Sequence, residues 1–300
     1  MRRHEHNEGF SLLEMLVSMS ILLIVVAVAL SALYSSQKIY ASQQLQADMH
    51  AGLRSSFELV TQEIGQAGAL NFAPKTLGAN VTGSTTAQNV TLSSVANIFV
   101  GERLTVDTVS AQETVQVTAI PSSSQVTGIF TQNHANGAAV VAQGVFPQGV
   151  LSSSGATALK LFGDINGDGS LAYVRYDCDT SAGTLTRSIT TVAPGVTTQN
   201  PPQILLSDLI ANPDGTPCFQ YSTTSVTVGA TTYTFIPSLA VSLTVQTAKI
   251  DPQTGTFVTM TKSFSNLASR NVLAGLAMAQ SSPPVTVRLQ PTPPGLPLTP

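Results

Sequence analysis

An apolar segment near the N-terminus constrains this chain more than any other feature. Glu14 is the only charged residue in the 24 positions from Phe10 to Leu33. A helix needs about 20 residues to cross the hydrocarbon core of a bilayer, so the segment is long enough to span a membrane. A polar stretch ends at Gly9, directly before it. The sequence therefore predicts a transmembrane helix over residues 10–33.

The first residues of this segment resemble the N-terminus of type IV prepilins and of the pseudopilins of type II secretion. The shared pattern is Gly-Phe-Ser/Thr-Leu-aliphatic-Glu, and Gly9 to Glu14 match it at every position. The resemblance implies that residues 1–9 are a leader, that prepilin peptidase cleaves between Gly9 and Phe10, and that the new amine of Phe10 is methylated. Glu14 then becomes the fifth residue of the mature chain.

A carboxylate inside a membrane segment costs about 2.5–3.5 kcal/mol on insertion scales, and such groups are usually paired and functional. Glu14 of one subunit could neutralise the amine on Phe10 of a neighbouring subunit, which would set the register of helix on helix in a fibre. It could also pair with the amine of its own chain, four residues away, near the positive end of the helix dipole. A plain signal anchor with an accidental glutamate is the third interpretation.

Charges flanking the segment indicate its orientation. Arg2 and Arg3 precede it, and Lys38 is the first charge after it. The positive-inside bias then places the N-terminus in the cytoplasm and the bulk of the chain outside the inner membrane. The resemblance implies a later place in an extracellular pilus or a periplasmic pseudopilus. It also implies four kinds of partner: other major and minor pilins, prepilin peptidase, the inner-membrane assembly platform and membrane lipid.

The helix is expected to continue well past the membrane. Proline first occurs at position 74, and apolar residues recur at steps of three or four, a one-sided helical stripe. They are Leu45, Met49, Leu53, Phe57, Val60 and Ile64. Gly65, Gly68 and Pro74 are stop signals. We therefore predict one N-terminal helix over residues 10–70, about 85 Å long from Phe10 to Ala67 at 1.5 Å per residue.

The remainder of the chain alternates polar and apolar residues in the manner of β-strands. The predicted class is α+β: a long N-terminal helix packed on an antiparallel β-sheet, with an inserted small all-β module. A linker is expected at 71–80, the module at 81–145 and the main sheet domain at 146–280. The closing segment from Asn266 to Ala279 is either helix or strand. Seven prolines lie between 281 and 300, too many for a core, and predict a flexible tail.

The module over 81–145 resembles small β modules of bacterial surface and phage structural proteins. It is either a ligand-binding part or a spacer on the subunit surface. His134 is expected to be a turn residue rather than a ligand, because neither His nor Cys lies near it in sequence.

An acidic, glycine-rich loop suggests one candidate metal site. Asp164, Asn166 and Asp168 have the 1, 3, 5 spacing of a calcium loop, with Gly169 at position 6. Position 12 is Arg175, where a calcium loop needs a bidentate glutamate. Asp-Gly and Asn-Gly pairs also form ordinary hairpin turns. The sequence favours the turn over calcium, and no other cofactor is expected.

Cys178 and Cys218 are the only cysteines, and both follow the membrane segment. In an oxidising compartment one disulfide between them is the economical expectation. Closing the loop of about 40 residues between Cys178 and Cys218 stabilises a fold by about 4 kcal/mol on the chain-entropy model.

Composition and spacing exclude several classes of function. Charged residues make up 10% of the chain and the net charge is −3, so no basic field predicts an obligate nucleic-acid partner. No nucleophile, base and orienting residue share a supporting spacing, so an enzyme is not expected. Looser resemblance at Leu45–Leu70, at the Tyr-Asp-Cys stretch ending in Cys178 and at Gly183–Arg187 favours a large minor pilin of the PilW type, a priming or tip subunit. A type II secretion pseudopilin, and a pilus-borne adhesin or DNA-uptake subunit using the 81–145 module, are the alternatives.

Overall fold

The computed structural model describes residues 11–71, 73–193 and 195–299. Its helices are α1 (Leu12–Gln66) and α2 (Arg270–Gln280), and its 3-10 turns are η1 (Val109–Ala111) and η2 (Thr286–Arg288). The strands are β1 (Lys75–Thr76), β2 (Gln88–Thr91), β3 (Arg103–Val106), β4 (Glu113–Gln116), β5 (Ala119–Ser122), β6 (Gln125–Gly128), β7 (Ala139–Ala142), β8 (Ala158–Gly163), β9 (Ala172–Asp179), β10 (Thr184–Thr191), β11 (Gln203–Ser207), β12 (Leu209–Ile210), β13 (Phe219–Val228), β14 (Thr231–Gln246) and β15 (Thr259–Leu267).

The predicted long helix is confirmed as α1, which runs for 55 residues without a break. It contains no proline, and two serines of its first half bond to the preceding turn. The hydroxyls of Ser20 and Ser36 donate to the carbonyls of Leu16 and Ala32, at 2.8 and 3.0 Å. The predicted apolar stripe is buried at every position from Met49 to Ile64 and partly buried at Leu45.

The helix ends where glycines let three backbone segments meet. Gly68 has a φ of +76°, the left-handed conformation typical of the residue after a helix. Its N–H donates to the carbonyl of Phe162 at 2.7 Å, and its carbonyl accepts from the N–H of Phe146 at 3.0 Å. A Cβ added at Gly149 would lie 2.3 Å from the nitrogen of Gly68, so no side chain fits there. The end of α1 is therefore fixed by backbone contacts to β8 and to the segment before it.

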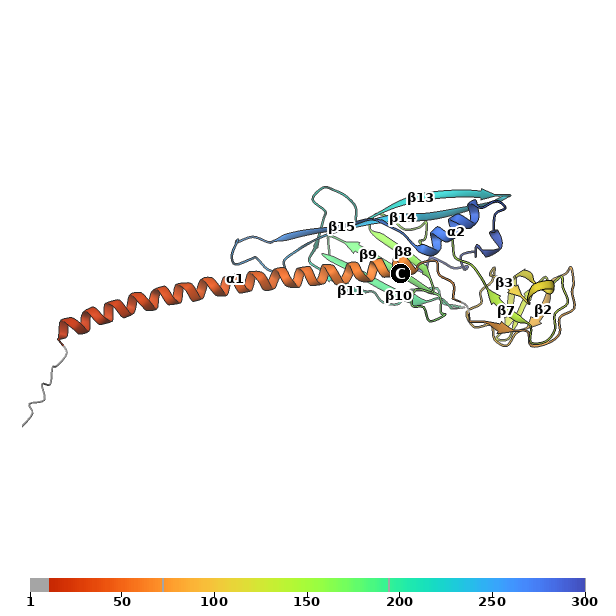
Figure 1. The fold of residues 1–300 in the computed structure, drawn as a ribbon, viewed down its shortest axis with the longest axis horizontal. Helices are drawn as coiled ribbons and strands as arrows, with labels where there is room; N and C mark the ends of the chain where they lie inside the picture. The colour runs from red at the N-terminus through yellow and green to blue at the C-terminus, as the bar shows by residue number, and fades with distance from the viewer. Residues whose placement is uncertain (1–10, 72, 194, 300) are drawn as a thin grey trace, which may run out of the picture. The chain divides into compact units, whose positions relative to one another are not determined.

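Two antiparallel sheets receive the buried face of α1, and they confirm the predicted α+β class (Figure 1). One has the strand order β11-β10-β9-β8. The other has the order β12-β14-β13, with β15 also paired to β14. The ring of Phe57 in α1 meets the ring of Phe264 in β15 edge-on, with 5.1 Å between centroids. Helix α2 resolves the open alternative at 266–279 in favour of a helix; the Ser269 side chain caps it by accepting from the N–H of Val272.

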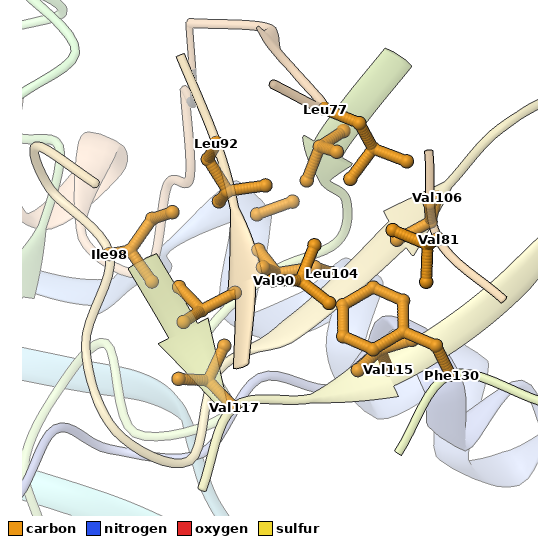
Figure 2. Packing of buried hydrophobic residues seen from close by; sticks show 13 residues of the cluster. Leu77, Val81, Val90, Leu92, Ile98, Leu104, Val106, Val115, Val117 and Phe130 are labelled. Carbon is orange, nitrogen blue, oxygen red and sulfur yellow. The ribbon is translucent and has the colours of Figure 1, made fainter. Parts of the chain in front are cut away.

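The inserted module has its own hydrophobic core. Its sheets have the orders β1-β7-β3-β4 and β2-β6-β5. Figure 2 shows the buried side chains that fill the space between them, among them Leu104, Val115 and Phe130. The module also begins earlier than expected. Lys75 and Thr76, assigned to the 71–80 linker from the sequence, pair with β7, and Leu77 is 1% exposed in the same core.

The proline-rich C-terminal segment differs from the expectation. Leu289 and Leu298 are buried at 0% and 4% exposure, and residues 289 and 299 form parallel bridges to Val145 and Thr198. The prediction that this segment adds nothing to a core is therefore wrong at these two leucines. Prolines prevent a regular strand, but the leucines between them still gain by leaving water.

The turn between β14 and β15 packs on the middle of α1. The Asp251 side chain accepts from the Ser42 hydroxyl at 2.9 Å and from the N–H of Gln253 at 2.8 Å. The hydrogen bond from Gln253 is the main reason that the pKa of Asp251 lies below its ordinary value. This buried carboxylate therefore holds the turn in shape and also binds the helix.

Candidate functional site

The candidate site is the N-terminal part of α1, which begins with a side-chain cap. The N–H of Ser11 donates to Glu14 Oε2 at 3.2 Å, and the N–H of Met15 donates to the carbonyl of Ser11 at 3.1 Å. Glutamate three residues after a serine is the spacing of a capping box, in which the acid returns to the N–H at the helix start. Glu14 therefore lies in the first turn with its carboxylate directed toward the N-terminal end of the helix.

Apolar side chains cover this part of α1 on all faces. Those from Leu12 to Leu33 are exposed, with values such as 80% at Leu12 and 68% at Leu23. A helix that is apolar all round is stable only when lipid or other helices cover it. By length and composition α1 is able to cross a membrane. The segment is therefore suited to a bilayer, to a bundle of like helices, or to both in turn.

Two of the predicted site residues lie outside the described residues. They are Gly9 and Phe10, where cleavage and N-methylation are predicted. Both remain predictions that follow from the sequence.

The acidic loop at Asp164 adopts a turn built by its own carboxylate. Asp164 Oδ1 accepts from the N–H of Asp168 at 3.1 Å, and Oδ2 accepts from the N–H of Gly169 at 3.0 Å. Gly167 and Gly169 have φ values of +72° and +81°, the conformation that such a turn requires. Between residues 11 and 299, leaving out 72 and 194, no group of three His, Cys, Asp or Glu side chains is arranged to hold a metal. These contacts favour the turn over the calcium alternative, in which Asp164, Asn166 and Asp168 would be ligands.

Cys178 of β9 and Cys218, just before β13, form a disulfide, with 6.5 Å between their Cα atoms. Both residues are buried, at 5% and 6% exposure. The bond links the two sheets that cover α1, because β9 and β13 belong to different sheets. The disulfide lies in the core of the sheet domain, and both cysteines are far in sequence from the N-terminal segment.

A buried polar cluster at the end of α1 was missed by the sequence analysis. Glu63 is 4% exposed, and its carboxylate accepts from Arg187 Nε of β10 at 3.1 and 3.2 Å. The Tyr176 hydroxyl of β9 also donates to Glu63. Burial, with the Glu63 charge next to it, raises the pKa of Tyr176 well above its usual range. Helical periodicity alone does not show which polar residue meets a buried partner, so it does not single out Glu63.

A second buried cluster lies inside the module. His134 is 3% exposed, with Nδ1 at 3.1 Å from Asp107 and Nε2 at 2.6 Å from Glu113. The hydrogen bond with His134 holds the pKa of Asp107 below its ordinary value. Burial raises the pKa of Glu113, but hydrogen bonds from His134, Thr131 and Gln132 outweigh it and lower the value. His134 lies 27 and 21 positions after its partners Asp107 and Glu113. No local spacing in the sequence therefore predicts these contacts.

Comparison with known protein families gives a match on the candidate segment. Residues 6–30 match the family model described as the prokaryotic N-terminal methylation motif. No curated protein matches the chain. The match covers Gly9, Phe10 and Glu14 together with most of the apolar segment.

Proposed function

We propose that this chain, which carries the N-terminal methylation motif of type IV prepilin-like proteins, is a minor pilin that acts in type IV pilus assembly as a priming or tip subunit. The observation that carries the proposal is the register of three features. The motif spans residues 6–30, Glu14 lies in the first turn of α1, and an exposed apolar helix follows directly. A simple membrane anchor has no need of the first two.

The motif implies processing by prepilin peptidase and assembly with other pilins. Cleavage after Gly9 would place an ammonium group on Phe10, in an apolar setting where an unpaired charge is costly. In our proposal Glu14 of one subunit neutralises the Phe10 amine of the next. The ion pair fixes the stagger between neighbouring helices, and the apolar faces supply the contact area.

Before assembly the same helix would hold the subunit in the inner membrane. The α1 segment passes the length and composition test for a span, and the residues after it fold into the sheet domain. In this state the Ser11 N–H already donates a hydrogen bond to the Glu14 carboxylate. The carboxylate is therefore positioned near the helix start before a neighbour arrives.

Mass spectrometry of the mature N-terminus tests the first part of the proposal. We expect a chain that begins at Phe10 with a methylated amine. An intact Met1 on the membrane-inserted protein would contradict it.

Substitution of Glu14 tests the second part. In cells that express Glu14→Ala in place of the native chain, we expect normal processing and membrane insertion but loss of the subunit from pili. Glu58→Ala is the matched control, because Glu58 is an exposed carboxylate of the same helix that pairs with Arg54. Entry of the Glu14→Ala chain into filaments as efficiently as the control would refute the role proposed for Glu14.

A pseudopilin of type II secretion would use the same N-terminal chemistry. Deletion of the gene separates the two machines: loss of pili supports our proposal, and loss of exported enzymes with normal pili supports the alternative. The large size of the chain, 300 residues, favours a minor subunit over a major one within either machine.

A second candidate function belongs to the module. Its separate hydrophobic core is typical of a part that folds as its own unit and serves its own purpose, such as adhesion or DNA uptake. Deleting residues 81–143 would then abolish surface attachment or uptake while leaving pili in place. Loss of pili in the same deletion would assign the module to assembly instead.

A further inference from the structure

The segment from Pro283 to Thr299, which we call the C-terminal strap, contacts both the module and the sheet domain. Its central residue is Gln290, which is 1% exposed. Gln290 Oε1 accepts from the N–H of Arg103 in β3 at 2.9 Å, and Gln290 Nε2 donates to the carbonyl of Arg103 at 2.9 Å. Nε2 also donates to the carbonyl of Gln143 at 2.9 Å. One amide side chain therefore joins strand β3 of the module to the segment through which the chain leaves the module.

Arg103 returns these contacts from the module side. Its guanidinium donates to the carbonyl of Thr286 at 3.1 Å and to that of Leu289. Hydrogen bonds from a charged donor are stronger than those between neutral groups. The side chain of Gln290 and the side chain of Arg103 thus each bind the backbone of the other segment, which is a reciprocal clasp.

The backbone of the strap continues the attachment next to this clasp. The N–H of Val145 donates to the carbonyl of Arg288 at 2.9 Å, and the N–H of Gln290 donates to the carbonyl of Val145 at 2.9 Å. A Cβ added at Gly144 would lie 1.8 Å from the Arg288 oxygen, so the close approach requires glycine there. Both the side chains and the backbone are arranged for this crossing.

The far end of the strap is attached to the sheet domain. The N–H of Thr299 donates to the carbonyl of Thr197 at 3.0 Å, and the N–H of Gln199 donates to the carbonyl of Thr299 at 2.8 Å. Leu298 is buried against Phe146, Phe162 and Tyr173. Between the two attachments, Pro293 to Leu298 form one wall of a cavity of about 620 Å³. Its lining also includes residues 96–100 and 120 of the module and residues 171, 191–193 and 195–197 of the sheet domain.

We propose that the C-terminal strap is an intramolecular lock that holds the module on the sheet domain, with the Arg103–Gln290 clasp as its catch. With the strap in place, the module moves as one piece with the sheet domain. When the clasp opens, the whole strap lifts and the cavity loses its wall. The module then keeps the direct contacts of its 97–99 loop, which are the hydrogen bond from Asn97 Nδ2 to the carbonyl of Gly169 and the ring contact between Phe99 and Phe146. The lock is a property of the fold and does not rest on the function proposed above.

Hydrogen exchange on the full-length protein in detergent micelles, read by mass spectrometry, tests the lock. The variant Gln290→Ala removes the three side-chain hydrogen bonds of the catch. The lock predicts roughly five- to tenfold faster exchange at Val145 and also at Thr299 and Gln199, which never touch the altered side chain. Peptides from β3 and β4 inside the module keep their protection. Gln280→Ala is the control, because Gln280 is an exposed glutamine of α2, and it leaves all of these rates unchanged.

A truncation that ends the chain at Gln290 approaches the lock from its other end. It removes the Thr299 attachment and leaves the clasp residues in place. The lock predicts faster exchange at Val145 in this variant as well. Faster exchange at Arg103 alone in Gln290→Ala, or at Gln199 alone in the truncation, would show independent contacts and overturn the proposal. Loss of protection throughout β3 and β4 in both variants would also overturn it, because the strap would then be part of the module's own fold.

Discussion

The Glu63 carboxylate of α1 accepts hydrogen bonds from both Nε and Nη2 of Arg187 in β10, at a site where Glu63 is 4% exposed. This pair and the Tyr176 hydroxyl beside it connect the last turn of the helix to the sheet β11-β10-β9-β8. Apolar packing alone leaves a helix free to slide or rotate by small amounts along a sheet. A bidentate polar contact has one geometry, so it fixes where α1 lies on the sheet.

Removal of this carboxylate should destabilise the sheet domain strongly. For Glu63→Ala we expect a loss of about 2–4 kcal/mol, because the Arg187 guanidinium and the Tyr176 hydroxyl are left without their partner in a largely buried site. Chemical denaturation followed by far-ultraviolet circular dichroism measures it. The control is Glu58→Ala, whose side chain is exposed on the same helix; it should leave the midpoint unchanged. Equal midpoints for both variants would contradict the role of Glu63.

Glu102 should make the module less stable as pH rises. This side chain is fully buried, its Oε1 has no hydrogen-bond partner among the described residues, and burial raises its pKa to about 8. The folded state therefore holds its proton between the ordinary value of 4.5 and about 8, where the unfolded state releases it, so stability falls across this window as pH rises. Glu102→Gln should match the native chain at pH 4 and exceed it by roughly 2–4 kcal/mol at pH 8.

Thermal unfolding of the native and Glu102→Gln chains at both pH values measures this difference. Hydrogen exchange at β3 and β4 assigns it to the module. A constant difference between the two chains from pH 4 to pH 8 would show that the Glu102 carboxyl does not titrate in this window.

The cluster around His134 should make the module less stable as pH falls into the acid range, the opposite of the effect of Glu102. The pKa values of Asp107 and Glu113 are lowered in the folded state, so their contribution is complete above the ordinary values and is lost as pH falls through the folded values, below about 4. His134→Gln should weaken the module at neutral pH and reduce this acid loss. Hydrogen exchange in β4 and in the 131–134 segment reports it. The control is His50→Gln, an exposed position on α1, and an equal effect at both positions would refute the assignment.

Loss of the Cys178–Cys218 bond should lower the stability of the sheet domain. The chain-entropy model gives about 4 kcal/mol for the 40-residue separation. We expect the double variant Cys178→Ser with Cys218→Ser to unfold at lower denaturant than the native chain. The native chain in reducing buffer should fall to about the same midpoint. Insensitivity of the native chain to reductant would mean that the bond does not stabilise the fold.

Much of the architecture follows from periodicity in the sequence. The stripe from Leu45 to Ile64 predicts both the length of α1 and the face that it buries, because each apolar residue gains in the same way from leaving water. Alternation in the segments 103–108 and 239–245 likewise predicts β3 and β14. These signals are local, and they need no knowledge of what lies opposite.

No such periodicity predicts which polar residues are buried. Glu63 and His134 are buried because their partners arrive from 124 and 21–27 positions away in the sequence, and no short window contains both sides. The same holds for Leu289 and Leu298 among their prolines. Their composition indicated a free tail, whereas a few long-range hydrogen bonds and two leucines are enough to attach it to the rest.

The hydrogen bond between Gly68 and Phe146 has a consequence for how this chain can diverge. The chain departs toward the module just after Gly68 and is back at Phe146, within one hydrogen bond of its point of departure. The intervening 77 positions therefore leave the sheet domain and return to it at almost the same place. A few residues would close the same gap. A related chain can therefore shorten, replace or omit the module while α1 and its two sheets keep their structure.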